Sequence, residues 1–241
     1  MSQLKHVGPI TVEVAPGHGP EGEKLGVSPT YRNLAAVDEI PTQLEGSSTL
    51  FEVFESSVSK FGDRPCLGWR PVSDDGQAGP YQFLTYNECR EKARALASSL
   101  SQCGVARGGK IGVYSANSVN WMLAIRAADV LSAAIVPIYD SLGESAVEYI
   151  VKHSELTVAL VETSKLVHFA KVAPSIAEQV KHVVVMDDSK LLSAASSALD
   201  TIKGAGLSVH SWEEFLRLGV GTGFEPEPPK PEDVACIMYT R

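Results

Sequence analysis

Three stretches of the chain open on the same four-residue signature and continue with apolar residues at helical spacing. In each signature, a threonine or serine is followed three residues later by a glutamate. This spacing lets the two side chains accept hydrogen bonds from the free N–H groups at the start of a helix. Apolar residues then recur every three to four positions until a glycine ends the run. The pattern predicts three amphipathic helices, over residues 49–62, 85–104 and 211–219.

Short apolar runs alternate with helical segments in the middle of the chain. The apolar runs predict buried strands at 111–114, 134–139, 157–162 and 182–187. Helical spacing separates them at 118–133, around 146–151 and at 164–179. The alternation predicts an α/β fold: a mainly parallel sheet with right-handed crossovers and helices on both faces. Such sheets bind ligands beyond the carboxyl ends of their strands.

Three more strands are predicted outside this alternating region. Two of them, at 66–70 and 81–84, flank a polar loop rich in turn residues. The third is a buried strand at 234–240, close to Arg241.

Prolines divide the chain into parts. Of the fourteen prolines, five lie in residues 1–48 and four in residues 219–233. Residues 1–45 also have little periodicity, so we expect an extended N-terminal arm. Residues 219–233 are expected to form an ordered loop or linker, and residues 46–241 the folded body.

Composition and charge are those of a globular protein. Hydrophobic residues make up 44% and charged residues 21%, and 21 basic against 29 acidic residues give a net charge of −8. These values exclude general disorder, collagen and coiled coil, and they disfavour a general nucleic-acid binder. The four cysteines have no CxxC or zinc spacing, and we expect reduced thiols in a cytosolic compartment: Cys66, Cys89, Cys103 and Cys236.

No segment predicts a signal peptide or a membrane span. The N-terminus lacks a long apolar core and a small-residue cleavage site. The most apolar window, 121–139, contains Arg126, Asp129 and Pro137. This window is either a membrane span or a buried helix followed by a buried strand. The two charged residues and the proline within it favour the second interpretation.

The common catalytic and nucleotide-binding motifs are missing. The sequence contains no GxGxxG after a strand, GxxxxGK[ST], HExxH, GxSxG or CxxC. The six histidines are scattered, and we expect them to be solvated or hydrogen-bonded rather than metal ligands. Asp187 and Asp188 follow a strand, and an acidic residue at that place either binds ribose or acts as a helix N-cap before Ser189. The N-cap is the preferred interpretation. Asp140 or Ser141, after another strand, is expected to cap the next helix.

Several separated motifs resemble one enzyme family in that family's order. Residues 79–105 and 110–155 are similar to AMP-forming acyl-CoA synthetases, and VPIYDSLG, AVEYIVKHSE and SWEEFLRLG narrow the resemblance to the eukaryotic, plant-like long-chain branch. SPTYRNLAA at 28–36 and residues 49–70 resemble the N-terminal region of that branch. The resemblance therefore spans about 28–240 and corresponds to the N-terminal third of the family.

The resemblance implies a two-step ligase. A long-chain fatty acid and ATP give acyl-adenylate and pyrophosphate, and CoA then takes the acyl group, with Mg²⁺ as the expected metal. It also implies that residues 46–241 are a partial AMP-binding (adenylation) domain. The family's usual place, in the cytoplasm or on the surface of the endoplasmic reticulum or another endomembrane, is implied in the same way.

The resemblance stops at the start of the phosphate loop. Family members continue from IMYT into YTSGTTGxPKG; here Tyr239 and Thr240 match, and Arg241 replaces the serine. Such a loop cradles polyphosphate with successive backbone N–H groups, and its lysine stabilises transferred charge. We therefore assign Tyr239 and Thr240 to the start of the ATP site, name no catalytic or metal-binding residue, and expect the isolated chain to be inactive.

Two alternatives stay open. The chain is either part of a ligase or a truncated, non-catalytic protein that binds a nucleotide, an acyl chain or a partner. An unrelated Rossmann-like binding module is a third interpretation, which the missing glycine fingerprint disfavours.

Overall fold

The computed structural model describes residues 10–19, 26–41, 43–44, 46–73, 76–139, 145–186 and 195–240. Two compact units, Met1–Ser48 and Thr49–Arg241, make up the chain. In the first unit, β1 (Thr11–Ala15) and β2 (Thr30–Asn33) form an antiparallel hairpin that the sequence pattern does not anticipate. Every described side chain of this unit is at least partly exposed, so the hairpin has no core of its own.

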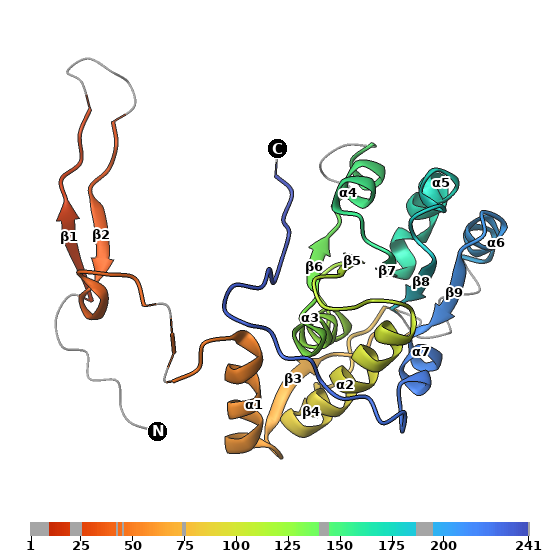
Figure 1. The fold of residues 1–241 in the computed structure, drawn as a ribbon, viewed down its shortest axis with the longest axis horizontal. Coiled ribbons are helices and arrows are strands. Elements are labelled where there is room, and N and C mark those ends of the chain that lie inside the picture. Colours follow the sequence, from red (N-terminus) through yellow and green to blue (C-terminus); the bar gives the residue numbers. More distant parts are fainter. Residues whose placement is uncertain are drawn as a thin grey trace. The chain divides into compact units, whose positions relative to one another are not determined.

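A five-stranded parallel sheet forms the centre of the second unit (Figure 1). Its spatial order is β6-β5-β7-β8-β9, and all four neighbouring pairs are parallel. The strands are β5 (Lys110–Tyr114), β6 (Ala134–Pro137), β7 (Val158–Val161), β8 (His182–Val185) and β9 (Ser208–Ser211). The predicted α/β class and parallel sheet are confirmed, whereas β9 was not anticipated because its SVHS run carries no apolar pattern.

Helices cover both faces of this sheet. The first face packs against α2 (Tyr86–Gln102), α3 (Val119–Leu131) and α7 (Trp212–Leu218). The second face packs against α4 (Ala146–Ser154), α5 (Leu166–Ile176) and α6 (Ser196–Gly204). Because β7 and β6 are covered on both sides, each is buried at every position, as expected of continuous apolar strands.

The predicted helix starts are present as hydrogen-bonded caps. Thr49 and Glu52 form a complete capping box at α1 (Leu50–Phe61), and Thr85 and Glu88 form another at α2. At α7 the Ser211 hydroxyl accepts the N–H of Glu214. Local sequence alone therefore defines these helix starts.

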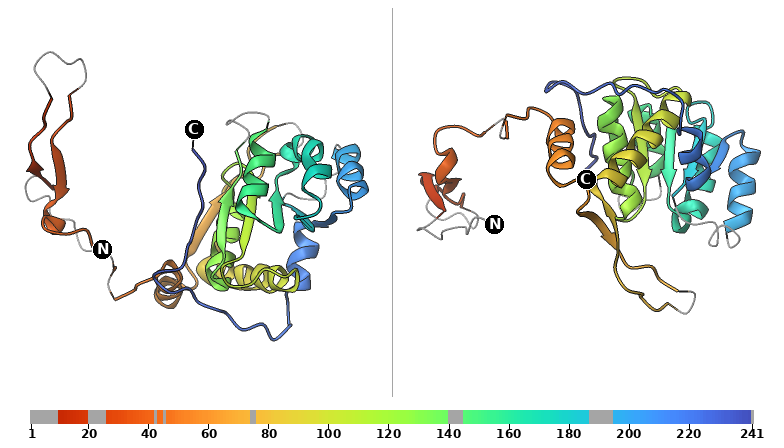
Figure 2. Two further views of the ribbon diagram at one scale, coloured as in Figure 1. Left: turned by 45° about the horizontal axis from the view of Figure 1, so that its top comes forward. Right: turned by 90° about the horizontal axis from the view of Figure 1, so that it is seen from below.

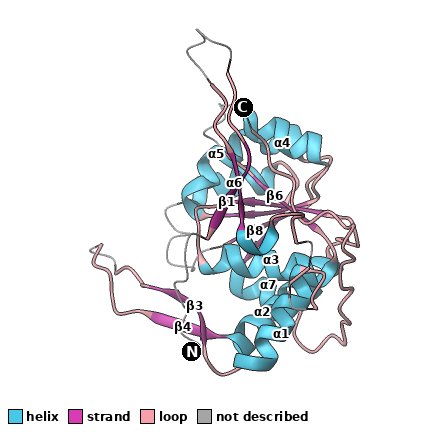
Figure 3. Cartoon of the chain, turned by 90° about the vertical axis from the view of Figure 1, so that its left-hand side faces the viewer, coloured by secondary structure: helices cyan, strands magenta, loops and turns pink. Residues whose placement is uncertain are grey.

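Two smaller features complete the second unit. An antiparallel pair, β3 (Pro65–Trp69) and β4 (Gln82–Thr85), projects from the helices as a hairpin (Figures 2 and 3). The proline-rich loop after α7 returns across α2 and α3, where the N–H of Glu227 donates to the Val130 carbonyl at 2.8 Å. Arg107 also pairs with Asp233 at 2.6 Å, so this loop is ordered, as predicted.

The predicted buried strand at 234–240 is wrong. This segment is extended, but within the described part of the chain it forms a single bridge, between Cys236 and Ile135 of the edge strand β6. Val234 and Met238 are 61% and 65% exposed. A strand is buried when helices cover both of its faces, and none of the described helices covers this segment on its outer side. Apolar composition alone does not supply that cover.

The apolar window at 121–139 lies inside the fold. Val136 and Ile138 are buried, and the window divides into α3 and β6. Among the described residues, no helix combines the length and the apolar character needed to cross a bilayer.

Candidate functional site at the carboxyl edge of the sheet

Two neighbouring central strands lead into helices on opposite faces of the sheet. β5 leads into α3 on the first face of the sheet, whereas its neighbour β7 leads into α5 on the second face. In open parallel sheets, the crevice beyond the carboxyl ends of such a strand pair is the usual ligand site. The residues that follow β5 and β7 therefore define the candidate site.

Glu162, directly after β7, already occupies this crevice. Its Oε2 accepts the Ala116 N–H at 2.7 Å and the Ser115 hydroxyl at 3.3 Å, and its Oε1 accepts the Ser164 hydroxyl at 2.8 Å. Burial by itself would raise the pKa of Glu162. The hydrogen bonds from Ala116, Ser164 and Ser115, with the nearby Lys165, nevertheless hold that pKa below its ordinary value. The Glu162 carboxylate thus ties the loop after β7 to the loop after β5.

A second group of side chains lies beside this carboxylate on the α5 face. The buried Tyr114 ends β5, and its hydroxyl lies 2.9 Å from Nδ1 of His168 on α5. The Lys165 ammonium lies 5.6 Å from the centre of the Tyr114 ring. These contacts fix α5 against the end of β5.

An open cavity of about 460 Å³ lies on the other face of the same edge. Asn117 contributes from the loop after β5, Asn120 from the start of α3 and Met186 from the end of β8. Trp69 and Trp212 contribute from β3 and α7. Its size is that of a small-molecule pocket.

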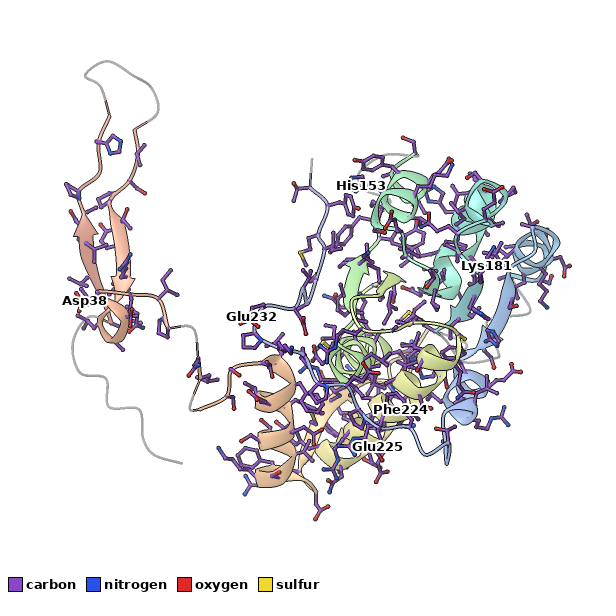
Figure 4. The ribbon with its side chains drawn as sticks, viewed as in Figure 1. Asp38, His153, Lys181, Phe224, Glu225 and Glu232 are labelled. Carbon is purple, nitrogen blue, oxygen red and sulfur yellow. The ribbon has the colours of Figure 1, made fainter. Side chains whose placement is uncertain are left out.

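Tyr239 and Thr240, the residues assigned to the start of the ATP site, follow the segment that runs along β6. The Ile135 N–H donates to the Ala235 carbonyl at 3.0 Å, and the Ile237 N–H donates to the Ile135 carbonyl at 2.9 Å. The bridge is parallel, so the chain leaves β6 toward the carboxyl edge of the sheet. The Tyr239 hydroxyl lies 2.8 Å from Nδ1 of His153 on α4, which lies beside the C-terminal segment (Figure 4).

Five other positions that the sequence analysis named lie outside the described residues: Asp140, Ser141, Asp187, Asp188 and Arg241. His182 and His210 are 28 positions apart in sequence, yet adjacent strands bring Nδ1 of the first to 3.3 Å from Nε2 of the second. Sequence spacing gave no signal for this pair.

The described residues do not form a phosphate cradle or a metal centre by themselves. The Ala116 N–H, in the loop after β5, already donates to the Glu162 carboxylate. Across the described part of the chain, no three His, Cys, Asp or Glu side chains are grouped so that they could hold a metal ion. We therefore derive no step through ATP or Mg²⁺ from these residues.

Comparison with known proteins places the chain in a family. Residues 54–240 match the family described as AMP-binding enzyme. "Long chain acyl-CoA synthetase 5" of Arabidopsis thaliana is 35% identical over 214 residues, which cover 89% of this chain and 31% of that protein. "Probable CoA ligase CCL6" of Humulus lupulus is 33% identical over 222 residues, which cover 92% of this chain and 33% of the relative.

Solved structures share the fold. The adenylation domain of a carboxylate reductase from Mycobacterium chelonae has a TM-score of 0.70 at 20% identity and covers 82% of this chain and 33% of that domain's chain. A long-chain-fatty-acid-CoA ligase from Archaeoglobus fulgidus has a TM-score of 0.56 at 23% identity, and the match covers 79% of this chain and 34% of that ligase's chain. This chain spans about a third of the length of the relatives that it matches. The chain belongs to the AMP-binding enzyme family and resembles the long-chain acyl-CoA synthetases within it.

Proposed function

We propose that residues 46–241 form the first part of the adenylating domain of a long-chain fatty acid–CoA ligase, preceded by an arm at 1–45. The observation that carries this proposal is the family match over 54–240, combined with 35% identity to a long-chain acyl-CoA synthetase. The position of Thr240, which follows a segment directed toward the carboxyl edge of the sheet, is in keeping with a phosphate loop that begins there.

The proposed reaction has two steps. The fatty acid carboxylate attacks the α-phosphorus of ATP, pyrophosphate leaves, and an acyl-adenylate forms. The CoA thiolate then attacks the acyl carbonyl carbon, and AMP leaves with the electrons of the broken C–O bond. Magnesium would offset the polyphosphate charge. We extend the proposal to a cytoplasmic enzyme that associates peripherally with an endomembrane.

The 241-residue chain is proposed to be inactive alone. A backbone N–H cradle and a phosphate-loop lysine are the groups that adenylation needs, and Tyr239 and Thr240 cannot replace them. Purified chain would be incubated with ATP, Mg²⁺, oleate and CoA while pyrophosphate is followed. The expected result is no release above a protein-free blank. Release that scales with protein concentration would contradict the proposed inactivity.

Sequencing the transcript past the Arg241 codon tests the ligase assignment. The expected frame continues into SGTTGxPKG, and the protein made from it should convert oleate, ATP and CoA into oleoyl-CoA, AMP and pyrophosphate. A stop at Arg241 in every transcript would favour the non-catalytic binding protein instead. An extended protein that carries the loop but forms no acyl-adenylate with any fatty acid would overturn the ligase assignment.

A further inference from the structure

The segment that leads to Thr240 has few attachments to the sheet. Among the described residues, two backbone hydrogen bonds tie it to β6, and both involve Ile135. The Ile237 side chain and the Tyr239 ring, two residues apart, pack against the second core cluster, which consists of the buried apolar residues between the second face of the sheet and helices α4, α5 and α6. The direction in which the chain leaves the sheet therefore depends on what holds Tyr239.

Two aromatic side chains on α4 hold Tyr239. Tyr149 and His153 are four residues apart, so they lie on one face of the helix, and their rings stack with centres 5.2 Å apart. The Tyr239 ring meets both edge-on, at interplanar angles of 85° and 82°. Edge-to-face contacts of this kind are favourable because the positive ring edge meets the negative ring face.

A hydrogen bond completes the contact. The Tyr239 hydroxyl and Nδ1 of His153 are 2.8 Å apart. Burial raises the pKa of Tyr239 and the neighbouring Tyr149 adds to the rise, while a hydrogen bond with Ser154 opposes it. The tyrosine therefore keeps its proton at neutral pH.

The helix that carries this pair is itself fixed in the core. Val147, Ile150 and Val151 of α4 are buried in the second cluster. By contrast, Tyr149 and His153 are exposed, and their rings contact Tyr239 of the C-terminal segment. Two aromatic side chains on the solvent side of α4 thus hold Tyr239, which lies 86 positions beyond His153 in the chain.

We propose that Tyr149 and His153 are positioning residues that fix Tyr239 and thereby aim Thr240 into the phosphate loop of the ligase. This inference rests on the proposed function for its link to ATP, whereas the docking of Tyr239 does not. Neither side chain touches the reacting atoms in this proposal; both act through Tyr239.

The first experiment measures hydrogen exchange at the Ile237 amide in the 241-residue chain. His153→Ala and Tyr239→Phe each remove one partner of the hydrogen bond, and exchange should become up to about tenfold faster. His153→Asn, which keeps a polar atom near the place of Nδ1, should restore part of the protection. Lys152→Ala, on the same helix and paired with Glu148, is the control and should leave the Ile237 amide unchanged.

The second experiment uses the extended protein from the transcript. His153→Ala should weaken ATP binding by up to about tenfold, as measured by titration calorimetry and by the KM for ATP. The KM for oleate should be unchanged. His153→Asn should recover part of the lost ATP affinity.

The outcomes separate this inference from the proposed function. Unchanged Ile237 exchange in both His153→Ala and Tyr239→Phe overturns the docking role. Faster exchange with unchanged ATP affinity in an active enzyme overturns the positioning role and leaves the ligase assignment intact. A wild-type extended protein that neither binds ATP nor forms acyl-CoA overturns the ligase assignment and the ATP link, and the exchange result still decides the docking role.

Discussion

The Glu162 carboxylate accepts the backbone N–H of Ala116 at 2.7 Å, which ties the loop after β7 to the loop after β5. The same carboxylate also accepts two serine hydroxyls. A side chain of the protein therefore joins the ends of β5 and β7, while the open cavity lined by Asn117 lies on the other face of the same edge.

Replacing Glu162 should reduce the stability of the chain in mildly acidic and neutral solution. Its pKa is lowered in the folded state, so its stabilising contribution is present above the unfolded pKa and is lost as pH falls through the folded pKa. Glu162→Gln should lower the free energy of unfolding at pH 7 by about 2 kcal/mol. It should also flatten the loss of stability toward low pH. Urea unfolding across a pH series checks this, with the exposed Glu178→Gln as control; equal acid sensitivity in the Glu162 variant and wild type would argue against it.

Asp129 should have the opposite pH dependence. Burial raises the pKa of Asp129 from 3.8 to about 6, although Arg126, at 3.0 Å, opposes the rise. A raised carboxyl pKa stabilises the fold most below about pH 4, and this contribution is lost as pH rises through about 6. The pKa shift corresponds to a change of about 3 kcal/mol in the free energy of unfolding between pH values well below 4 and well above 6. In Asp129→Asn this dependence should disappear.

The measurement for Asp129 is the difference in unfolding free energy between wild type and Asp129→Asn at several pH values. The exposed Asp200→Asn serves as the control variant. A difference that stays constant with pH would mean that the Asp129 carboxyl does not titrate in this range.

The pair His182 and His210 should make the fold sensitive to mild acid. Burial lowers the pKa of His182, and the charge of His210, 3.3 Å away, lowers it further. The unfolded chain then binds this proton more readily, so stability falls as pH drops through about 6.5. His182→Asn should move the start of the decline in melting temperature to lower pH. His18→Asn, in the first unit, is the matched control, and a decline identical to wild type in His182→Asn would contradict the prediction.

Gly219 should not tolerate a side chain. A Cβ atom at this position would overlap the backbone carbonyl oxygen of Ala95 on α2. Because that contact is with backbone, the proline-rich loop would have to move. Gly219→Ala should destabilise the chain by about 2–3 kcal/mol. Gly204→Ala, where a Cβ meets nothing within 4 Å, is the control; equal midpoints of urea unfolding for the two variants would contradict the expected overlap.

The uncovered segment beside β6 should promote association of the 241-residue chain. Val234 and Met238 are mostly exposed, and Cys236 lies on the open side of an edge strand. Exposed edges with apolar side chains favour pairing with other chains. Light scattering after size-exclusion chromatography should show oligomers that Met238→Lys reduces. A monodisperse wild-type monomer with a sharp thermal transition would instead indicate a self-sufficient domain.

Sequence alone determined the features that depend on neighbouring residues. The capping boxes at Thr49 and Thr85 are local hydrogen-bond patterns, so they could be predicted and are present. The apolar runs of β7 and β6 predicted strands buried on both sides, because a parallel sheet covered by helices favours continuous apolar sequence. The family was also visible in the sequence, since its motifs occur in order along the chain.

Tertiary structure decided whatever depends on distant neighbours. The 234–240 segment has the same apolar composition as the buried strands, but it lies on β6 at the edge of the sheet, where no described helix covers its outer face. The contact between His182 and His210 requires the register of β8 with β9, and that between His153 and Tyr239 requires α4 and the C-terminal segment to meet on the same sheet edge. Neither pairing has a sequence signal, because burial and side-chain contact are set by which elements pack together and not by the composition of each element.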